Sequence, residues 1–260
     1  MGYNRFQVPP PLNPANHLHL NLSVHVQDVI EINEKLGYFR TKMDINRWWI
    51  DQRLTYQNLK KAGNNEVTPQ DGDLIWTPWT VFINIESKDK YAAADKDPVK
   101  RVIPNPNFDF TVGDKTFLDN TYLFKGSENT MNFEVEYTVE WLCDFHMGLY
   151  PFDSQTCTME FLHTEDSINL VPTTVHYSGP SHLPQHTVKR VNMCNSIIEG
   201  RKGVLVEMTF DRPLFSTFLT VALPTVILVM ISQMATVFTG EYIDMVIQVN
   251  LTVLLVLATL

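Results

Sequence analysis

Apolar and polar residues alternate along much of the first 210 residues of the chain. Within residues 17–60, five apolar side chains recur at every second position: Leu18, Leu20, Leu22, Val24 and Val26. A period of two places them on one face of a half-buried β-strand. The alternation returns over residues 132–145, again with five apolar positions: Phe133, Val135, Tyr137, Val139 and Trp141. Both segments are therefore predicted to be strands with one face in a core.

Shorter runs repeat this strand pattern and are separated by clusters of turn-forming residues. The runs are 121–126, 155–163, 186–193 and 203–210, and the clusters are 64–73, 105–109, 125–129 and 177–184. Many short strands with such punctuation are typical of an antiparallel β-sandwich, here over about residues 17–211. The charged segment 87–101 is expected to be an exposed loop.

The pattern changes at Leu214, where the chain becomes almost continuously apolar. Residues 214–238 include no charged side chain, and a helix of this length exceeds a hydrocarbon core of about 30 Å. We therefore expect a first membrane span there, in which Pro224 is tolerated because neighbouring helices satisfy the freed carbonyl. A break at 239–244 precedes a second apolar run that reaches residue 260. The predicted fold is thus a β-sandwich domain over 1–212 followed by a transmembrane α-helical domain over 213–260.

The second predicted helix, over about 241–260, has its polar residues on one narrow stripe. The stripe members are spaced by three or four residues: Glu241, Asp244, Gln248, Leu251, Leu255 and Ala258. Acids at membrane depth are costly unless they face water or a partner, so the pattern favours a water-filled pore lined by copies of this helix. Alternatively, the two acids are solvated at the interface, while Gln248 and Asn250 bind a neighbouring helix.

Composition excludes several function classes. The chain has 20 basic and 29 acidic residues, a net charge of −9, and lacks a basic cluster, which disfavours nucleic-acid binding. Its three cysteines do not show zinc-type spacing. It lacks a glycine-rich phosphate loop and a nucleophile motif, and its eight histidines are scattered. We therefore expect no enzyme, no metal and no cofactor.

Residues 143–157 carry the most specific motif, which reads Cys143-x-Phe145-x-Met147-x-x-Tyr150-Pro151-x-Asp153-x-x-x-Cys157. It resembles the signature of the Cys-loop receptor family, the pentameric ligand-gated ion channels. The resemblance implies a disulfide between Cys143 and Cys157, which restricts the unfolded chain by about 3 kcal/mol in the entropy model. Cys194 is left over and is expected to be a buried or half-buried free thiol.

Further motifs extend the resemblance over nearly the whole chain. They are Asn33-Glu34-Lys35, Trp49-Ile50-Asp51, Leu74-Ile75-Trp76-Thr77-Pro78, Arg212 and Gly240-Glu241-Tyr242. The last of these is similar to the start of the pore helix in cation-selective members. We expect an invertebrate orphan member, such as an annelid one. The resemblance also implies a third and a fourth membrane helix, for which the sequence has no segment.

The resemblance assigns the disulfide loop to the surface that transmits motion from the sandwich to the membrane helices. The implied gating interface comprises Glu34, Lys35, Tyr150, Pro151, Phe152, Asp153 and Arg212. A purely structural disulfide is the alternative, and the two roles are compatible.

The ligand-binding positions of the family transfer poorly to this chain. The aromatic residues expected there are replaced by Asp44, Ile83 and Thr164. An ammonium ligand needs aromatic faces, so choline-like and other amine agonists are disfavoured and the small-molecule ligand is unidentified. Asp44, His163 and Glu165 are candidates for a substitute pocket, or are ordinary surface residues.

Together these features predict one subunit of a homopentamer in the plasma membrane, with its N-terminal domain extracellular. Glu241 and Asp244 would form acidic rings that favour cations, and Leu251 would form an apolar gate. The alternative is a membrane-anchored β-sandwich receptor that binds a ligand without conducting ions. Asn21 begins a glycosylation sequon on the expected extracellular side.

Overall fold

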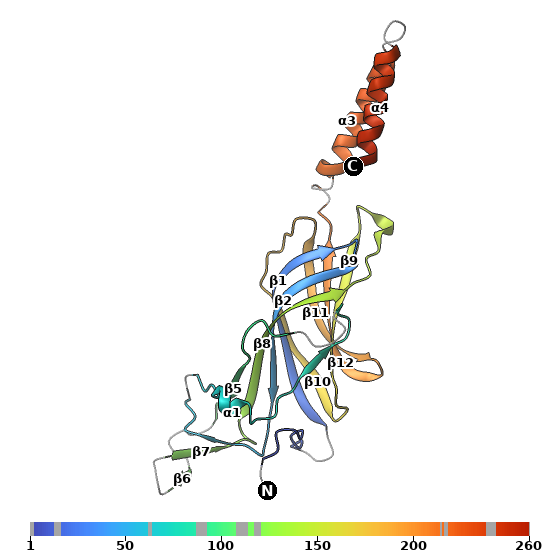
Figure 1. Cartoon of the computed structure of the whole chain (residues 1–260). Helices are drawn as coiled ribbons and strands as arrows, with labels where there is room; N and C mark the ends of the chain where they lie inside the picture. Colours follow the sequence, from blue (N-terminus) through green and yellow to red (C-terminus); the bar gives the residue numbers. More distant parts are fainter. Residues whose placement is uncertain are drawn as a thin grey trace. The chain divides into compact units, whose positions relative to one another are not determined.

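A computed structural model describes most of the chain (Figure 1). The described residues are 3–12, 17–61, 64–86, 93–107, 114–116, 121–213, 215, 218–237 and 243–259. They form two compact units. The first comprises 1–145, 156–180 and 190–209, and the second comprises 146–155, 181–189 and 210–260.

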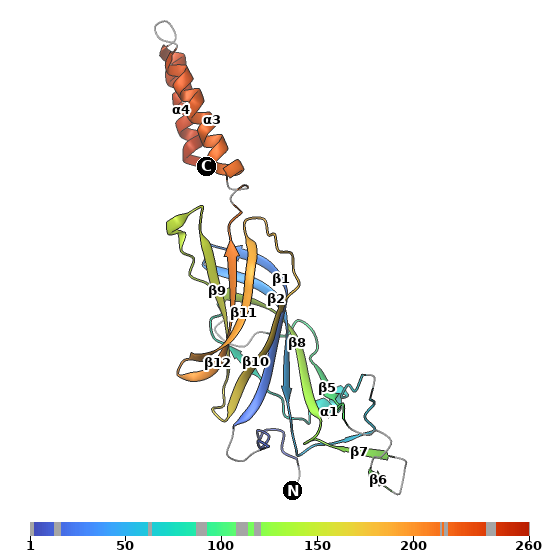
Figure 2. The ribbon, with the colours of Figure 1, turned by 180° about the vertical axis from the view of Figure 1, so that it is seen from behind.

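The first unit is built on a five-stranded sheet with the strand order β10-β1-β2-β8-β5. Strands β1 and β10 are parallel, and the other neighbours are antiparallel. Figure 2 shows the long strands of this sheet from behind. Their bounds are β1 Leu18–Asn33, β2 Tyr38–Trp49, β5 Val99–Ile103, β8 Thr130–Leu142 and β10 Ile168–Tyr177.

A second sheet has the order β11-β12-β9-β4, and a small third sheet has the order β3-β7-β6. The strands of the second sheet are β4 Thr80–Phe82, β9 Ser154–His163, β11 Thr187–Ile198 and β12 Arg201–Asp211. Those of the third are β3 Thr55–Gln57, β6 Asp114–Thr116 and β7 Thr121–Lys125. The described residues also include the short helix α1 Pro69–Gly72 and the 3₁₀ turn Met147–Leu149.

Burial follows the predicted alternation. The five apolar residues of β1 are at most 6% exposed and those of β8 at most 3%, which confirms the two long strands. The expectation that 87–101 is wholly a loop was wrong, because β5 begins at Val99 and pairs with β8. Val102 is 5% exposed, and this buried contact outweighs the charged neighbours that suggested a loop. Residues 87–92 lie outside the described chain.

An aromatic cluster joins the two larger sheets into a sandwich. The ring of Phe82 on β4 meets those of Tyr137, Trp141 and Phe161 edge-on, at centroid distances of 5.2, 5.5 and 5.6 Å. Such geometry is the favourable one for aromatic pairs. The indole Nε1 of Trp141 donates to Thr41 Oγ1 at 2.9 Å, so its polar group is satisfied although the side chain is fully buried. The β-sandwich predicted from the sequence is therefore present.

The second unit ends in two helices, α3 Leu223–Val237 and α4 Ile243–Thr259, which lie side by side in both views. A π-helical turn at Phe218–Ala222 precedes α3. Pro224 lies two residues after the end of this turn and has no N–H for the helical ladder, which explains why the apolar run is not one regular helix. In the described part of the chain, a helix both long and apolar enough to cross a membrane is not found. The structure therefore does not show the two predicted spans.

Replacing Trp141 by Ala is expected to lower the free energy of unfolding by about 3–5 kcal/mol, because it opens a cavity in the aromatic cluster. Denaturant unfolding followed by circular dichroism measures the change. The matched control is Leu142→Ala on the neighbouring position, where the side chain is 46% exposed. That change should stay within about 0.5 kcal/mol of the parent. Equal losses in the two variants would contradict this account of the core.

Candidate functional site

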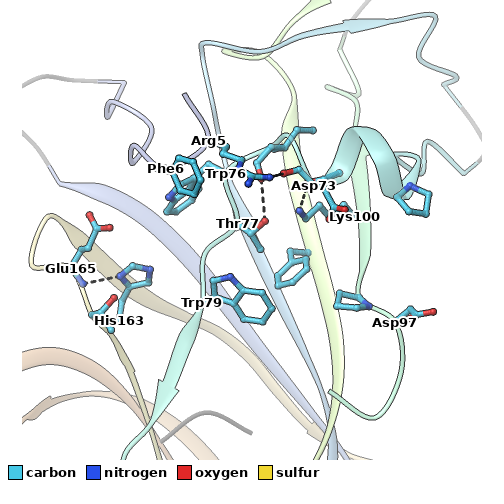
Figure 3. A pocket seen from close by; sticks show the side chains of 16 residues that line it. Arg5, Phe6, Asp73, Trp76, Thr77, Trp79, Asp97, Lys100, His163 and Glu165 are labelled. Atoms are coloured by element: carbon cyan, nitrogen blue, oxygen red, sulfur yellow. Dashed lines mark hydrogen bonds between the residues drawn. The ribbon is translucent and has the colours of Figure 1, made fainter. Parts of the chain in front are cut away.

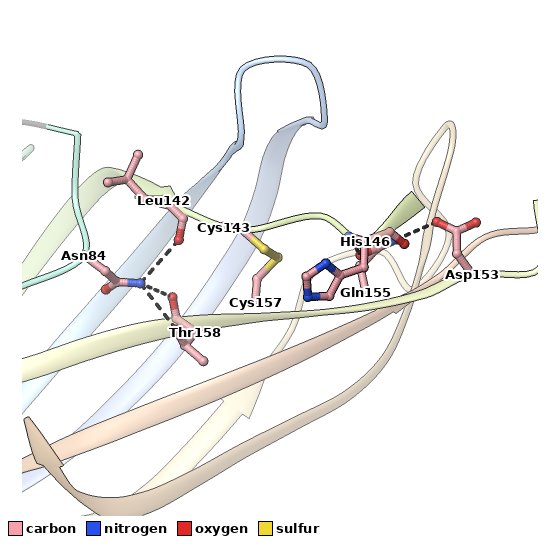
Figure 4. The surroundings of a disulfide bond; sticks show 8 residues. All are labelled: Asn84, Leu142, Cys143, His146, Asp153, Gln155, Cys157 and Thr158. Atoms are coloured by element: carbon pink, nitrogen blue, oxygen red, sulfur yellow. Dashed lines mark hydrogen bonds between the residues drawn. A yellow bond between two sulfur atoms is a disulfide. The ribbon is translucent and has the colours of Figure 1, made fainter. Parts of the chain in front are cut away.

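The structure joins Cys143 and Cys157 by a disulfide (Figure 4). Cys143 follows the end of β8, and Cys157 lies within β9 at 1% exposure. The side chain of Asn84 donates to the carbonyl oxygens of Thr158 at 2.6 Å and Leu142 at 3.4 Å. These bonds fix the two strands from which the loop departs.

Inside the loop, one amide side chain fixes the backbone. Gln155 Oε1 accepts from the N–H of His146 at 2.9 Å, while its Nε2 donates to the His146 carbonyl at 3.0 Å. The same Nε2 donates to Asp153 Oδ2 at 2.6 Å. By contrast, the side chains of Leu149 and Phe152 are 75% and 73% exposed. The loop therefore has a polar, hydrogen-bonded base and an apolar, exposed tip.

Asp153 also forms a bidentate ion pair with Arg212. The guanidinium Nε and Nη2 donate to the two carboxylate oxygens at 2.8 and 3.1 Å, and both side chains are less than a tenth exposed. The guanidinium carbon lies 4.8 Å from the centroid of the Tyr150 ring. Hydrogen bonding to Arg212 lowers the pKa of Asp153 to about 2, although burial opposes the shift. Three of the expected gating residues are thus in direct contact.

Two further gating candidates, Glu34 and Lys35, belong to the first unit. Glu34 and Lys35 are in the turn between β1 and β2. That turn closes at Gly37, whose φ of +73° is the left-handed conformation that suits glycine. The Gly37 carbonyl accepts from the N–H of Cys143 at 2.8 Å. This bond attaches the turn to the start of the disulfide loop.

The predicted pore stripe lies on one face of α4. Its described members Asp244, Gln248, Leu251 and Leu255 are all exposed. The opposite face carries Asn250, which is bonded to Ser232 of α3 at 2.7 Å, and the buried Val253. The interhelical contact of the alternative is therefore present for Asn250, whereas Gln248 is exposed. Glu241 lies outside the described residues, and Ala258 is in the last turn of α4.

The three transferred ligand positions are not brought together in one pocket of the described chain. Thr164 lines a cavity together with His163 and Glu165, whereas Asp44 and Ile83 do not line it. Asp44 accepts a hydrogen bond from Gln27 at 2.6 Å, and the Ile83 N–H donates to the Glu160 carbonyl at 3.1 Å. Of the candidates for a substitute pocket, His163 and Glu165 therefore share a site that Asp44 does not reach.

Comparison with known proteins supplies the family. Residues 1–201 match the family described as "Neurotransmitter-gated ion-channel ligand binding domain". The chain belongs to the Cys-loop receptor family. This confirms the resemblance read from the disulfide motif, and ligand-gated ion channels are not enzymes.

Individual relatives of this receptor chain differ in what their names state. An acetylcholine-gated chloride channel subunit (acc-1) of Caenorhabditis elegans is 23% identical over 80% of this chain and 38% of its own length. A gamma-aminobutyric acid receptor subunit beta-like of Drosophila melanogaster is 22% identical over 66% and 33%. An acetylcholine receptor subunit alpha-like of Manduca sexta is 24% identical over 62% and 26%. The chain spans less than two fifths of the length of these relatives.

Two features of the receptor chain differ from what its sequence predicted. Cys194 is a free thiol, but it is exposed. Its expected burial was wrong because, among the described strands, β11 is an edge strand whose one neighbour is β12. The bracing role of Gln155 was missed, since it occupies an unspecified position of the motif. The sequence carries no signal for it, because the 2% exposure that obliges this long amide to find partners is visible only in the structure.

The low pKa of Asp153 predicts an acid-sensitive contribution to stability. A depressed folded-state pKa gives a contribution that is present above about pH 4 and lost as the pH falls through about 2. Asp153→Asn should lower the free energy of unfolding at pH 7 by about 3–5 kcal/mol, because Arg212 loses its buried partner. The variant should also lose stability less steeply below pH 4, as measured by thermal unfolding from pH 6 to pH 2.

The control for this experiment is Asp144→Asn, which changes an exposed carboxylate of the same loop. It should keep the acid dependence of the parent protein. If Asp153→Asn loses stability below pH 4 as steeply as the parent protein, the ion pair is not the cause of the acid sensitivity.

Proposed function

We propose that the chain is a subunit of a pentameric ligand-gated ion channel, in which an extracellular β-sandwich gates a cation-selective helical pore. The observation that carries this proposal is the exposed stripe on α4. Asp244, Gln248, Leu251 and Leu255 face away from α3, so that face remains for copies of the same helix around an axis. Family membership supports the assembly, and its five-fold symmetry is part of the proposal.

A membrane position for residues 213–260 is part of the proposal and has support from exposure. Large apolar side chains off the stripe are exposed by 42–65% on both helices, among them Leu223, Met230, Met234, Met245 and Leu254. Contiguous apolar surface of this kind needs cover, and lipid supplies it. A persistent disulfide needs an oxidising compartment, which supports an extracellular place for the sandwich over 1–212 and a plasma-membrane location.

Cation selectivity rests on charge. Asp244 lies in the first turn of α4, Glu241 precedes it, and Lys and Arg do not occur anywhere in 214–260. Rings of carboxylates concentrate cations and repel anions. The relatives do not distinguish a cation channel from an anion channel, because at similar identities their names include a chloride channel and a receptor whose ion selectivity is not stated.

Leu251 and Leu255 are proposed to close the pore by excluding water, with Gln248 as the polar step between them and the acidic ring. The gating contact is proposed at Asp153, Arg212 and the exposed tip of the disulfide loop, together with Glu34 and Lys35. A non-conducting anchored receptor is less well supported, because an anchor does not need a polar stripe.

The ligand is proposed to be a small molecule other than a choline-like amine. The transferred positions Asp44, Ile83 and Thr164 lack the aromatic faces that hold an ammonium. Acetylcholine appears in the names of two of the relatives, but the residues of this chain do not provide the same chemistry.

Leu251→Thr is expected to open the channel without ligand, because a hydroxyl at the gate lets water enter. Reversal potentials in oocytes should then follow the sodium gradient, and adding Asp244→Asn should shift them toward the chloride potential. Leu254→Thr is the matched control, since Leu254 is equally exposed but lies off the stripe. It should leave the channel closed. A reversal potential that follows chloride in Leu251→Thr would overturn the cation assignment.

The assembly proposal predicts a particle of five chains. Native mass measurement in mild detergent should give a mass five times that of one chain. A monomer or a dimer under the same conditions would favour the anchored receptor instead.

A further inference from the structure

Three side chains form a row across the five-stranded sheet. Phe133 on β8 lies opposite Arg47 on β2 and opposite Lys100 on β5. Residues directly opposite one another in a ladder share a face of the sheet. The guanidinium carbon of Arg47 and the Nζ of Lys100 lie 5.4 and 5.7 Å from the centroid of the Phe133 ring. One aromatic ring therefore has a cation on each neighbouring strand.

Among the described residues, neither cation forms an ion pair with a carboxylate. Arg47 is fully buried, its Nε donates to Thr80 Oγ1 at 2.6 Å, and its Nη1 finds no hydrogen-bond partner in the part of the chain that the structure describes. The Nζ of Lys100 donates to the carbonyl of Gly72 at 2.5 Å. Burial lowers the pKa of both side chains. Buried positive charge without a negative partner is costly, which makes an anion the fitting complement.

Lys100 and Phe133 line a cavity of about 700 Å³ in the first unit (Figure 3). Two tryptophans, Trp76 and Trp79, form further walls, and the Trp79 ring meets Phe133 edge-on at 5.8 Å. Arg47 does not line the cavity, but its charge lies close to a ring that does. A volume of this size with aromatic walls is typical of small-molecule pockets.

The carboxylates that line the cavity are exposed, whereas two of its three basic side chains lie deeper and the third, Arg5, is exposed. The acidic lining residues Asp73, Asp97 and Glu165 are all exposed, so water screens them. Lys100 is half-buried, and His163 is 6% exposed. Burial lowers the pKa of His163 to about 4, and its Nδ1 accepts from the Glu165 N–H. At neutral pH the ring is therefore neutral with its proton on Nε2, a donor without charge.

We propose that this cavity binds a small organic carboxylate within a single subunit, with the carboxylate at Lys100 and an aromatic body against Trp76, Trp79 and Phe133. The site uses residues of one chain and one compact unit. It therefore goes beyond the channel proposal and does not rest on it, because binding can be measured whether or not the protein conducts.

The test uses the full chain in detergent, with benzoate as the probe and benzamide and benzylamine as its neutral and cationic counterparts. Calorimetry measures affinity, and a loss of tryptophan-fluorescence quenching in Trp79→Leu places the probe near that one of the five tryptophans. Benzoate should bind at least about tenfold more tightly than either counterpart. Equal or tighter binding of benzamide or benzylamine would overturn the proposal, and so would the absence of benzoate binding at millimolar concentration.

Variants locate the site. Lys100→Met should weaken benzoate binding about tenfold or more and leave benzamide unaffected, whereas Lys100→Arg should retain most of the benzoate affinity. The matched control Lys202→Met changes an exposed lysine on β12 and should have no effect. Trp79 is 49% exposed, so Trp79→Leu should fold even if Lys100→Met does not. Its expected result is weaker binding of benzoate, and unchanged binding in this variant would overturn the proposal.

Discussion

Edge-on contacts between aromatic rings hold the two larger sheets in one relative register. Phe82 of β4 packs between Tyr137 and Trp141 of β8 and Phe161 of β9. Because side chains alternate along each strand, fixing these rings also fixes which neighbours point inward. Arg47, Phe133 and Thr80 are directed into the sandwich for this reason. The register thereby places the cavity-lining residues Lys100, Phe133 and His163, which lie on strands, whereas Trp76 and Trp79 come from the segment between α1 and β4.

The disulfide loop in the second unit is held in shape by polar contacts, whereas the sandwich of the first unit is held by aromatic packing. The tip of the disulfide loop is exposed and cannot be ordered by burial of Leu149 or Phe152. Its shape depends instead on Gln155, Asp153 and Arg212, whose hydrogen bonds are charge-assisted and largely buried. A loop that is fixed at its base and apolar at its tip can transmit a displacement to a surface it touches, which is the role proposed for it.

The sequence predicted the parts that depend on periodicity or on a motif. Alternation identified β1 and β8, and the cysteine motif identified the disulfide and the family. It did not identify β5, because the charges of Lys100 and Arg101 hide a strand that the contact with β8 stabilises. The cavity was also missed, since its lining comes from segments far apart along the chain. Such a site depends on sheet register, which composition and local pattern do not encode.

The distribution of charge differs between the two proposed sites and argues that they serve different ions. At the cavity, Lys100 is half-buried and the adjacent Arg47 fully buried beside the Phe133 ring, while the carboxylates of Asp73, Asp97 and Glu165 are exposed. On α4 the charged member of the stripe is the carboxylate of Asp244, which is exposed. The electrostatic potentials at the two sites are therefore opposite in sign, although the chain as a whole has a net charge of −9. Asp244 attracts cations, whereas Lys100 attracts carboxylates. A permeating cation and a carboxylate ligand therefore do not compete for the same site.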